Sequence, residues 1–305
     1  MIEDLRKQQM ELVKQKAARA KQRRRKRILI LVPLLLLLLA VGFVVSQIMI
    51  NRHFITTRFQ LQSEKVTTTI KLAVLSDLHN MEYGAGNSEL IEAIRAEQPD
   101  LICMIGDMVN QDDRKVSSLY RLCEALEEIA PIYYTLGNHE GALMYSQLDA
   151  IPLDTELEER GVNVLINESV NWQKEDTMIR LIGIAIDDSG YDRWAKDALE
   201  ETWNLDGYKI VLSHFPGLYE GKLKDANFDL ALAGHYHGGL ICIPGAGGLY
   251  HPETGFFPQY WGGQYETTNG TLIVSRGIGN HGWIPRINNQ PELVIVEISP
   301  SIQEG

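Results

Sequence analysis

The sequence has little cysteine, and one long stretch has no charge. Its three cysteines, Cys103, Cys123 and Cys242, stand apart, with no CxxC pair among them. A fold that depends on disulfides is therefore not expected, and we predict that all three are small buried apolar residues. The 305 residues are enough for one large domain or two small ones.

Positive charge is scarce outside the first 27 residues. Residues 1–27 carry a balance of +8, whereas the chain after residue 50 carries −19. This acidic part of the chain is a poor partner for nucleic acid, because proteins bind nucleic acid largely by neutralising its phosphates. We therefore expect no nucleic-acid partner. A site for phosphate chemistry in this acidic part would obtain the positive charge that attracts phosphate from bound metal.

Residues 28–50 hold no charged side chain and include six consecutive leucines. This length spans a bilayer with some tilt. No A-x-A cleavage site follows, so we expect an uncleaved anchor. Lysine and arginine are frequent on the N-terminal side of this stretch. The positive-inside rule then places the N-terminus in the cytoplasm. The expected parts are a basic cytoplasmic arm (1–27), a transmembrane anchor in the cell membrane (28–50) and an extracytoplasmic domain (51–305).

After the anchor, the sequence alternates strand and helix patterns. Strands are expected at 55–63, 69–76, 101–105, 132–136, 162–166, 178–186, 208–213 and 229–233. Helices are expected near 88–97, 119–129, 149–160 and 193–201. This order is typical of a parallel sheet with crossover helices. The last third is expected to be strand-rich, and the predicted architecture is two stacked sheets flanked by helices.

Residues with metal-binding side chains come directly after several of these strands. The stretch 233–239 stands out, because two histidines lie one residue apart there between glycines. The candidate metal ligands are Asp77, His79, Asp107, Asn138, His214, His235 and His237. The C-terminal ends of strands are where α/β sheets form ligand crevices, so we expect these side chains to meet.

Seven such ligands are too many for one open catalytic site and suit two ions that share a ligand. Imidazole suits zinc, iron and manganese, whereas carboxylate and amide oxygens suit harder ions. Asp107 is the expected bridge, because a carboxylate has two oxygens and this one follows a middle strand. Two divalent ions less two carboxylates leave a charge of about +2, which attracts phosphate. His139 is the expected general acid, because it lies next to Asn138 and is not needed as a ligand.

The motifs D-x-H, G-D, G-N-H-E, a lone H and G-H-x-H occur in this order within residues 77–237. Together they resemble the signature of the calcineurin-like metallophosphoesterases. The resemblance implies a four-layer α/β/β/α sandwich and two divalent ions, with manganese or iron preferred and zinc also possible. It implies the following sites: one metal on Asp77, His79, Asp107 and His237, a second on Asp107, Asn138, His214 and His235, and His139 as the acid. The apolar segment before L-S-D-L-H is similar to the membrane-anchored or exported bacterial phosphodiesterase branch.

We therefore expect an anchored two-metal phosphoesterase in which a metal-bridging hydroxide attacks phosphorus. A phosphodiester or pyrophosphate substrate is preferred to a phosphomonoester, on resemblance alone. The run 106–111 lacks the arginine that serine/threonine phosphatases carry after G-D, which argues against phosphoproteins. Two alternatives stay open. One is a non-catalytic phosphate- or lipid-binding ectodomain on the same scaffold, and the other is a cytoplasm-facing nucleotide or phosphoprotein phosphatase.

Weaker candidates lie elsewhere in the chain. Asp187 and Asp188 are expected in a turn or helix cap in preference to a place near the crevice, and His251 and His281 at the surface in preference to contact with substrate. An aromatic-rich region follows the histidine turn, at Phe256, Phe257, Tyr260, Trp261 and Trp283. It is expected to pack a hairpin or to form an apolar lip for a lipid or nucleoside. About 20 residues of at most ~3.5 Å each join the anchor to the first buried strand, which keeps the site near the membrane.

Overall fold

The computed structural model describes residues 1–112, 114–280 and 285–301. The chain divides into two units, residues 1–49 and residues 50–305. The first unit is formed by helix α1 (Ile2–Ile50), which contains Pro33. By length and composition this helix is able to cross a membrane, and its apolar part is the charge-free stretch of the sequence.

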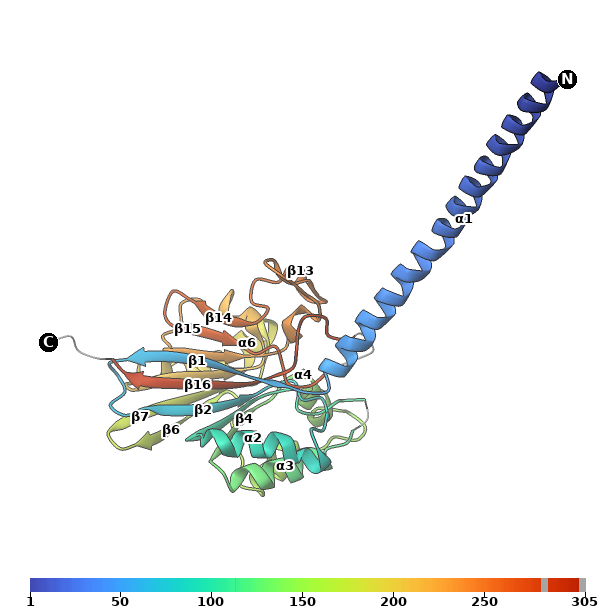
Figure 1. Cartoon of the computed structure of the whole chain (residues 1–305). Coiled ribbons are helices and arrows are strands. Elements are labelled where there is room, and N and C mark those ends of the chain that lie inside the picture. Colours follow the sequence, from blue (N-terminus) through green and yellow to red (C-terminus); the bar gives the residue numbers. More distant parts are fainter. Residues whose placement is uncertain (113, 281–284, 302–305) are drawn as a thin grey trace. The chain divides into compact units, whose positions relative to one another are not determined.

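The second unit begins with a six-stranded sheet in the order β1-β16-β2-β3-β4-β5. The bounds are β1 (Ile55–Ser63), β16 (Glu292–Pro300), β2 (Ile70–Leu75), β3 (Leu101–Ile105), β4 (Ile132–Thr135) and β5 (Asn163–Val164). Neighbouring strands run parallel except for the antiparallel pair β16 and β2. The crossover helices α2 (Ser88–Glu97) and α3 (Ser117–Glu127) lie side by side (Figure 1).

A second six-stranded sheet has the order β14-β15-β9-β8-β7-β6. The bounds are β14 (Gly263–Glu266), β15 (Thr271–Val274), β9 (Leu230–Ala233), β8 (Tyr208–Ser213), β7 (Thr177–Ile184) and β6 (Glu168–Lys174). Its four middle strands are parallel, and its two edge strands are antiparallel. Shorter helices connect the strands: α4 (Asn138–Met144), α5 (Leu153–Glu158), α6 (Asp188–Trp194) and α7 (Lys196–Leu199).

Three apolar cores separate four layers. One core packs residues of β2 and β3, such as Leu75 and Ile102, against Leu90 of α2 and Leu122 of α3. A second lies between the two sheets, and a third lies between the second sheet and the α6–α7 layer. Every residue of β3 is buried because both faces of its sheet are covered, which explains its continuous apolar sequence. The expected α/β/β/α sandwich is confirmed.

One expected pairing was wrong. The sequence predicts a hairpin between 162–166 and 178–186, but Asn163–Val164 joins the first sheet as β5. The partner of β7 is β6, an antiparallel edge strand that the prediction placed in a polar turn. Residues 168–174 are exposed or half-buried throughout, and only Val170 and Trp172 among them are apolar, so the segment has no strong strand pattern. The expected helix 193–201 is likewise two short helices, α6 and α7.

Candidate metal centre

Five strand ends meet at one edge of the sandwich, and backbone hydrogen bonds join the loops that follow them. The Asp77 N–H donates to Gly106 O at 3.0 Å, and the His79 N–H donates to Asp107 O at 3.1 Å. The Gly234 N–H donates to His214 O at 3.1 Å and joins the loops after β9 and β8 of the second sheet. The two sheets are joined here too, because the His235 N–H donates to the Asp77 carboxylate at 3.2 Å. The loops after β2, β3, β8 and β9 are therefore fixed to one another before any ligand binds.

Two glycines of the motifs are required by this close approach. A Cβ at Gly137 would overlap the Asp107 carboxylate, and a Cβ at Gly234 would overlap Ser76 and the Asp77 carboxylate. Only glycine leaves room for the neighbouring loop at these positions. The glycines of G-N-H-E and G-H-x-H thus make the site possible without contributing a ligand.

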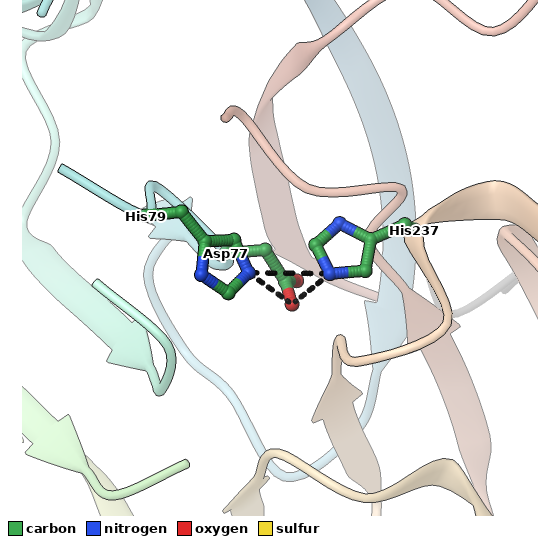
Figure 2. A group of neighbouring side chains, drawn as sticks. All are labelled: Asp77, His79 and His237. Carbon is green, nitrogen blue, oxygen red and sulfur yellow. Dashed lines mark hydrogen bonds and ion pairs between the residues drawn. The ribbon is translucent and has the colours of Figure 1, made fainter. Parts of the chain in front are cut away.

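The first group of candidate ligands is Asp77, His79 and His237 (Figure 2). The Nε2 atoms of the two imidazoles lie 3.2 Å apart. The Oδ1 atom of Asp77 lies 3.5 Å from His237 Nε2 and 4.0 Å from His79 Nε2. All three side chains point at one spot, two from the loop after β2 and one from the turn after β9.

The second group is Asp107, His214 and His235. Asp107 Oδ2 lies 3.1 Å from His214 Nε2, and His214 Nε2 lies 3.1 Å from His235 Nδ1. Asp107 Oδ2 also lies 3.9 Å from His79 Nε2, in the first group. Asp107 therefore stands between the two groups, which is the position expected of a bridging ligand.

Asn138 and His139 begin α4, directly after the loop that follows β4. Both line a cavity of about 240 Å³ together with Asp107, His235 and His237. The His139 ring lies close to the groups, with Nε2 at 3.8 Å from Asp107 Oδ2. The Gln111 N–H donates to His139 Nδ1 at 3.1 Å. This bond leaves the proton of the neutral ring on Nε2, the nitrogen that faces the groups. The structure thus brings all eight predicted site residues together.

Backbone strain is concentrated at the same residues. Five of the seven candidate ligands have positive φ angles: Asp77 (55°), His79 (48°), Asp107 (54°), His235 (71°) and His237 (48°). Such angles are uncommon outside glycine and cost about 1–3 kcal/mol each. They persist only where the surroundings fix them, as the shared hydrogen bonds do here. Strain gathered in this way is typical of a functional site.

Three groups that sequence reasoning missed hold the ligands in place. Asn110 Oδ1 accepts from His79 Nδ1, and Asn110 Nδ2 donates to His79 O, both at 3.0 Å. The carbonyl of Ile105 accepts from His214 Nδ1 at 2.8 Å. In their neutral form, both histidines therefore turn an unprotonated Nε2 toward the site. This is the usual arrangement of metal-binding histidines, whose far N–H is held by an oxygen.

Glu140 is the third such group and is fully buried. Its carboxylate accepts from the N–H groups of Asp107 (2.8 Å), Met108 (2.8 Å) and Gly137 (2.9 Å), and from the Tyr134 hydroxyl (2.8 Å). One carboxylate thus binds the loops after β3 and β4 together. The motif G-N-H-E contained this residue, but only the tertiary structure reveals what it does.

Burial and neighbouring charges shift the pKa values of the ionisable groups in the site. Burial raises the pKa of Asp77, and the neighbouring Asp107 raises it further. Burial opposes ionisation of Asp107 too, but His214 outweighs it and holds the Asp107 pKa well below its usual range. Burial would lower the pKa of His214, yet Asp107 raises it to about 10. The metal-free site therefore retains protons that a cation would displace on binding.

These residues fit divalent metal ions. Two carboxylates and four imidazoles are buried within a few ångströms. Once His214 has lost its extra proton to a binding cation, both His79 and His214 offer an unprotonated Nε2 to the site. Burial, reinforced by His79 and Arg286, lowers the pKa of His237 well below its usual value, so this ring is neutral and able to ligate. Imidazole and carboxylate together match zinc, iron and manganese.

Other predictions had mixed outcomes. Asp187 caps α6, accepting from the Gly190 N–H at 2.9 Å, as expected. The preferred surface position for His251 was wrong, because it is buried with its ring centroid 4.9 Å from that of His235. His251 lines the cavity instead, as the alternative of contact with substrate requires. All three cysteines are buried and free, as expected. The predictions for His281 and Trp283 concern positions outside the described residues.

A family model described as calcineurin-like phosphoesterase matches residues 70–239, more than half of the chain. The chain belongs to this family. An uncharacterized metallophosphoesterase of Aquifex aeolicus is 30% identical over 79% of this chain and 90% of its own length. The metallophosphoesterase YkoQ of Bacillus subtilis is 29% identical (73% and 82%), and the phosphodiesterase YaeI of Escherichia coli is 27% identical (75% and 82%). As a calcineurin-like phosphoesterase, the chain is a phosphoester hydrolase of a family that depends on two metal ions.

Proposed function

We propose that this protein is a membrane-anchored phosphodiesterase that uses two divalent ions. One observation carries the proposal: six potential ligands from four strand ends converge in two groups that Asp107 joins, and Asn138, after a fifth strand, lines the same cavity. The proposed ligand sets are Asp77, His79, Asp107 and His237 for one ion, and Asp107, Asn138, His214 and His235 for the other. The name of the Escherichia coli relative supports a diester rather than a monoester substrate.

When bound, the two ions would supply positive charge for the phosphate oxygens and lower the pKa of an attacking water. The chain's own residues then hold the ions and move a proton. Glu140 and Asn110 keep the ligand loops and the His79 ring in place. His139 keeps a proton on Nε2, because Nδ1 is occupied by the Gln111 N–H. His139 is thus the proposed general acid that protonates the leaving oxygen.

The test uses the full chain purified in detergent, stripped of metal and then supplied with manganese, iron(II) or zinc. Bis-p-nitrophenyl phosphate and p-nitrophenyl phosphate report diester and monoester hydrolysis. We expect metal-dependent turnover that favours the diester, is lost in Asp107→Asn and is unchanged in Asp197→Asn, an exposed aspartate of α7. Stoichiometric metal binding without turnover of either ester would overturn the proposal in favour of a phosphate-binding domain.

We further propose that residues 28–50 anchor the protein, with the N-terminus in the cytoplasm and residues 51–305 outside. The support is the charge-free stretch preceded by the basic run 23–27. Protease added to intact cells should remove the catalytic domain and leave the N-terminal arm, and the mass of the mature chain should include residues 1–50. A protected catalytic domain or a shortened N-terminus would contradict this topology.

A further inference from the structure

The cavity at the candidate metal centre has a polar wall and an apolar wall. The polar wall consists of the candidate ligands and His139. The opposite wall comes from the segment after the histidine turn and includes Leu240, Tyr250 and Pro252. Whatever is esterified to a phosphate at the metals would lie against this second wall.

Tyr250 extends the apolar wall to the surface. It belongs to β12 (Tyr250–His251), which pairs with β13 (Gly255–Phe256) so that Tyr250 lies opposite Phe256. The two ring centroids are 5.2 Å apart. Phe256 and the next residue, Phe257, are 71% and 53% exposed. We call Tyr250, Phe256 and Phe257 the aromatic lip. Large exposed apolar residues beside a cavity mark a binding surface.

The lip is anchored to the metal centre by its own hairpin. His251 packs against the His235 ring, and Glu253 Oε1 lies 3.0 Å from His235 Nε2. The Phe257 N–H donates to Leu249 O at 2.9 Å, which closes the base of the hairpin. The lip is thus held at a fixed place beside the cavity.

Positive charge is missing from this wall. No lysine or arginine occurs between Lys224 and Arg276, and the Arg276 guanidinium is paired with Glu292. Among the described residues that line the cavity there is also no lysine or arginine. A substituent with further phosphates would need such cations. A wall without positive charge therefore favours an organic group that carries no further phosphate.

Hydrogen-bonding side chains suited to a nucleobase are also scarce. No asparagine or glutamine occurs between Asn227 and Gln259. Bases are read by hydrogen bonds to their edges in addition to stacking. Alkyl chains need only apolar contact, and aromatic residues gather where proteins meet the lipid–water interface.

We propose that the substrate is a lipid phosphoester whose alkyl or acyl chain lies on the aromatic lip while its phosphate is at the metals. This inference rests on the proposed function and names its substrate class. The charge-free N-terminal stretch fits it, because an anchored enzyme works at a lipid surface.

The test compares three p-nitrophenyl phosphodiesters that share a leaving group and differ in the second substituent: methyl, hexyl and thymidine 5′-yl. The full chain is used in detergent with manganese. We expect kcat/KM for the hexyl ester to exceed that for the methyl ester at least tenfold. Phe256→Ser should reduce this ratio to about threefold or less. Trp194→Ser, which removes an exposed aromatic residue of α6, should leave the ratio unchanged.

A binding measurement supplies a readout independent of turnover. Titration calorimetry of hexylphosphonate and methylphosphonate should show tighter binding and a more negative heat capacity change for the hexyl compound, with the difference reduced in Phe256→Ser. Equal kcat/KM for hexyl and methyl esters, or a preference for the thymidine ester, overturns the lipid inference alone. Absence of metal-dependent hydrolysis of all three esters overturns the proposed function as well.

Discussion

The metal centre and the aromatic lip adjoin one cavity but are held in different ways. At the metal centre, buried side chains with strained backbone angles are fixed by hydrogen bonds from several loops. The lip rests on two-residue strands and a ring contact, and its outermost side chain, Phe256, is 71% exposed. A reaction centre needs positions held within a fraction of an ångström, whereas an alkyl chain needs only an apolar surface. Substitutions in the two parts should therefore have effects of different size.

The largest effect is expected for His139→Gln, a substitution at the metal centre. If His139 supplies the leaving-group proton, kcat should fall about 10³-fold for a diester with an alkoxide leaving group, which corresponds to about 4 kcal/mol. A p-nitrophenolate leaves without a proton, so its release should slow far less. Steady-state kinetics on both esters with matched metal content measure the two effects. His53→Gln, at an exposed histidine, is the control. Equal losses for both esters would rule out the acid role.

The rigidity of the metal centre is tested by Glu140→Gln. The amide nitrogen of glutamine cannot accept the N–H groups that the carboxylate binds, so one loop loses its partner. We expect the free energy of unfolding to fall by about 3 kcal/mol. Denaturant titration of the metal-free full chain in detergent measures this change. Tyr134→Phe removes one hydrogen bond from the same carboxylate and should cost about 1 kcal/mol. A smaller loss of unfolding free energy for Glu140→Gln than for Tyr134→Phe would contradict the role of Glu140 in joining the loops after β3 and β4.

The smallest expected effect lies where the two parts meet. Glu253 Oε1 is 3.0 Å from His235 Nε2, and the Glu253 side chain is 60% exposed. Removing its charge with Glu253→Gln should weaken binding of one metal ion about tenfold, the low end for a residue behind a ligand. Competition with a chromogenic chelator measures the two affinities separately. Glu200→Gln, an exposed glutamate of the second unit, should change neither. Unchanged affinities in Glu253→Gln would mean that the lip hairpin acts on the substrate alone.

Much of the fold could be predicted because strand and helix patterns are local. Residues 55–63, 101–105 and 208–213 were predicted with the bounds that the structure has. The first is polar enough to indicate an edge strand, and the other two are continuous buried runs. The edge strand β6 was missed, because a half-buried strand has no strong apolar pattern. The insertion of β16 between β1 and β2 depends on pairing across most of the chain, which local patterns do not encode.

By itself, the sequence determined the types of the candidate ligands, their order and their places after strands. Parallel strands with crossover helices end at one edge of the sheet, so such residues come together there. Only the tertiary structure decided how the site is held and bordered. Three contacts join residues from separate loops: the hydrogen bonds of Glu140 to the loop after β3, the bond between Asn110 and His79, and the packing of His251 against His235. Contacts of this kind depend on how closely loops approach in space, and they form only when the two sheets have packed together.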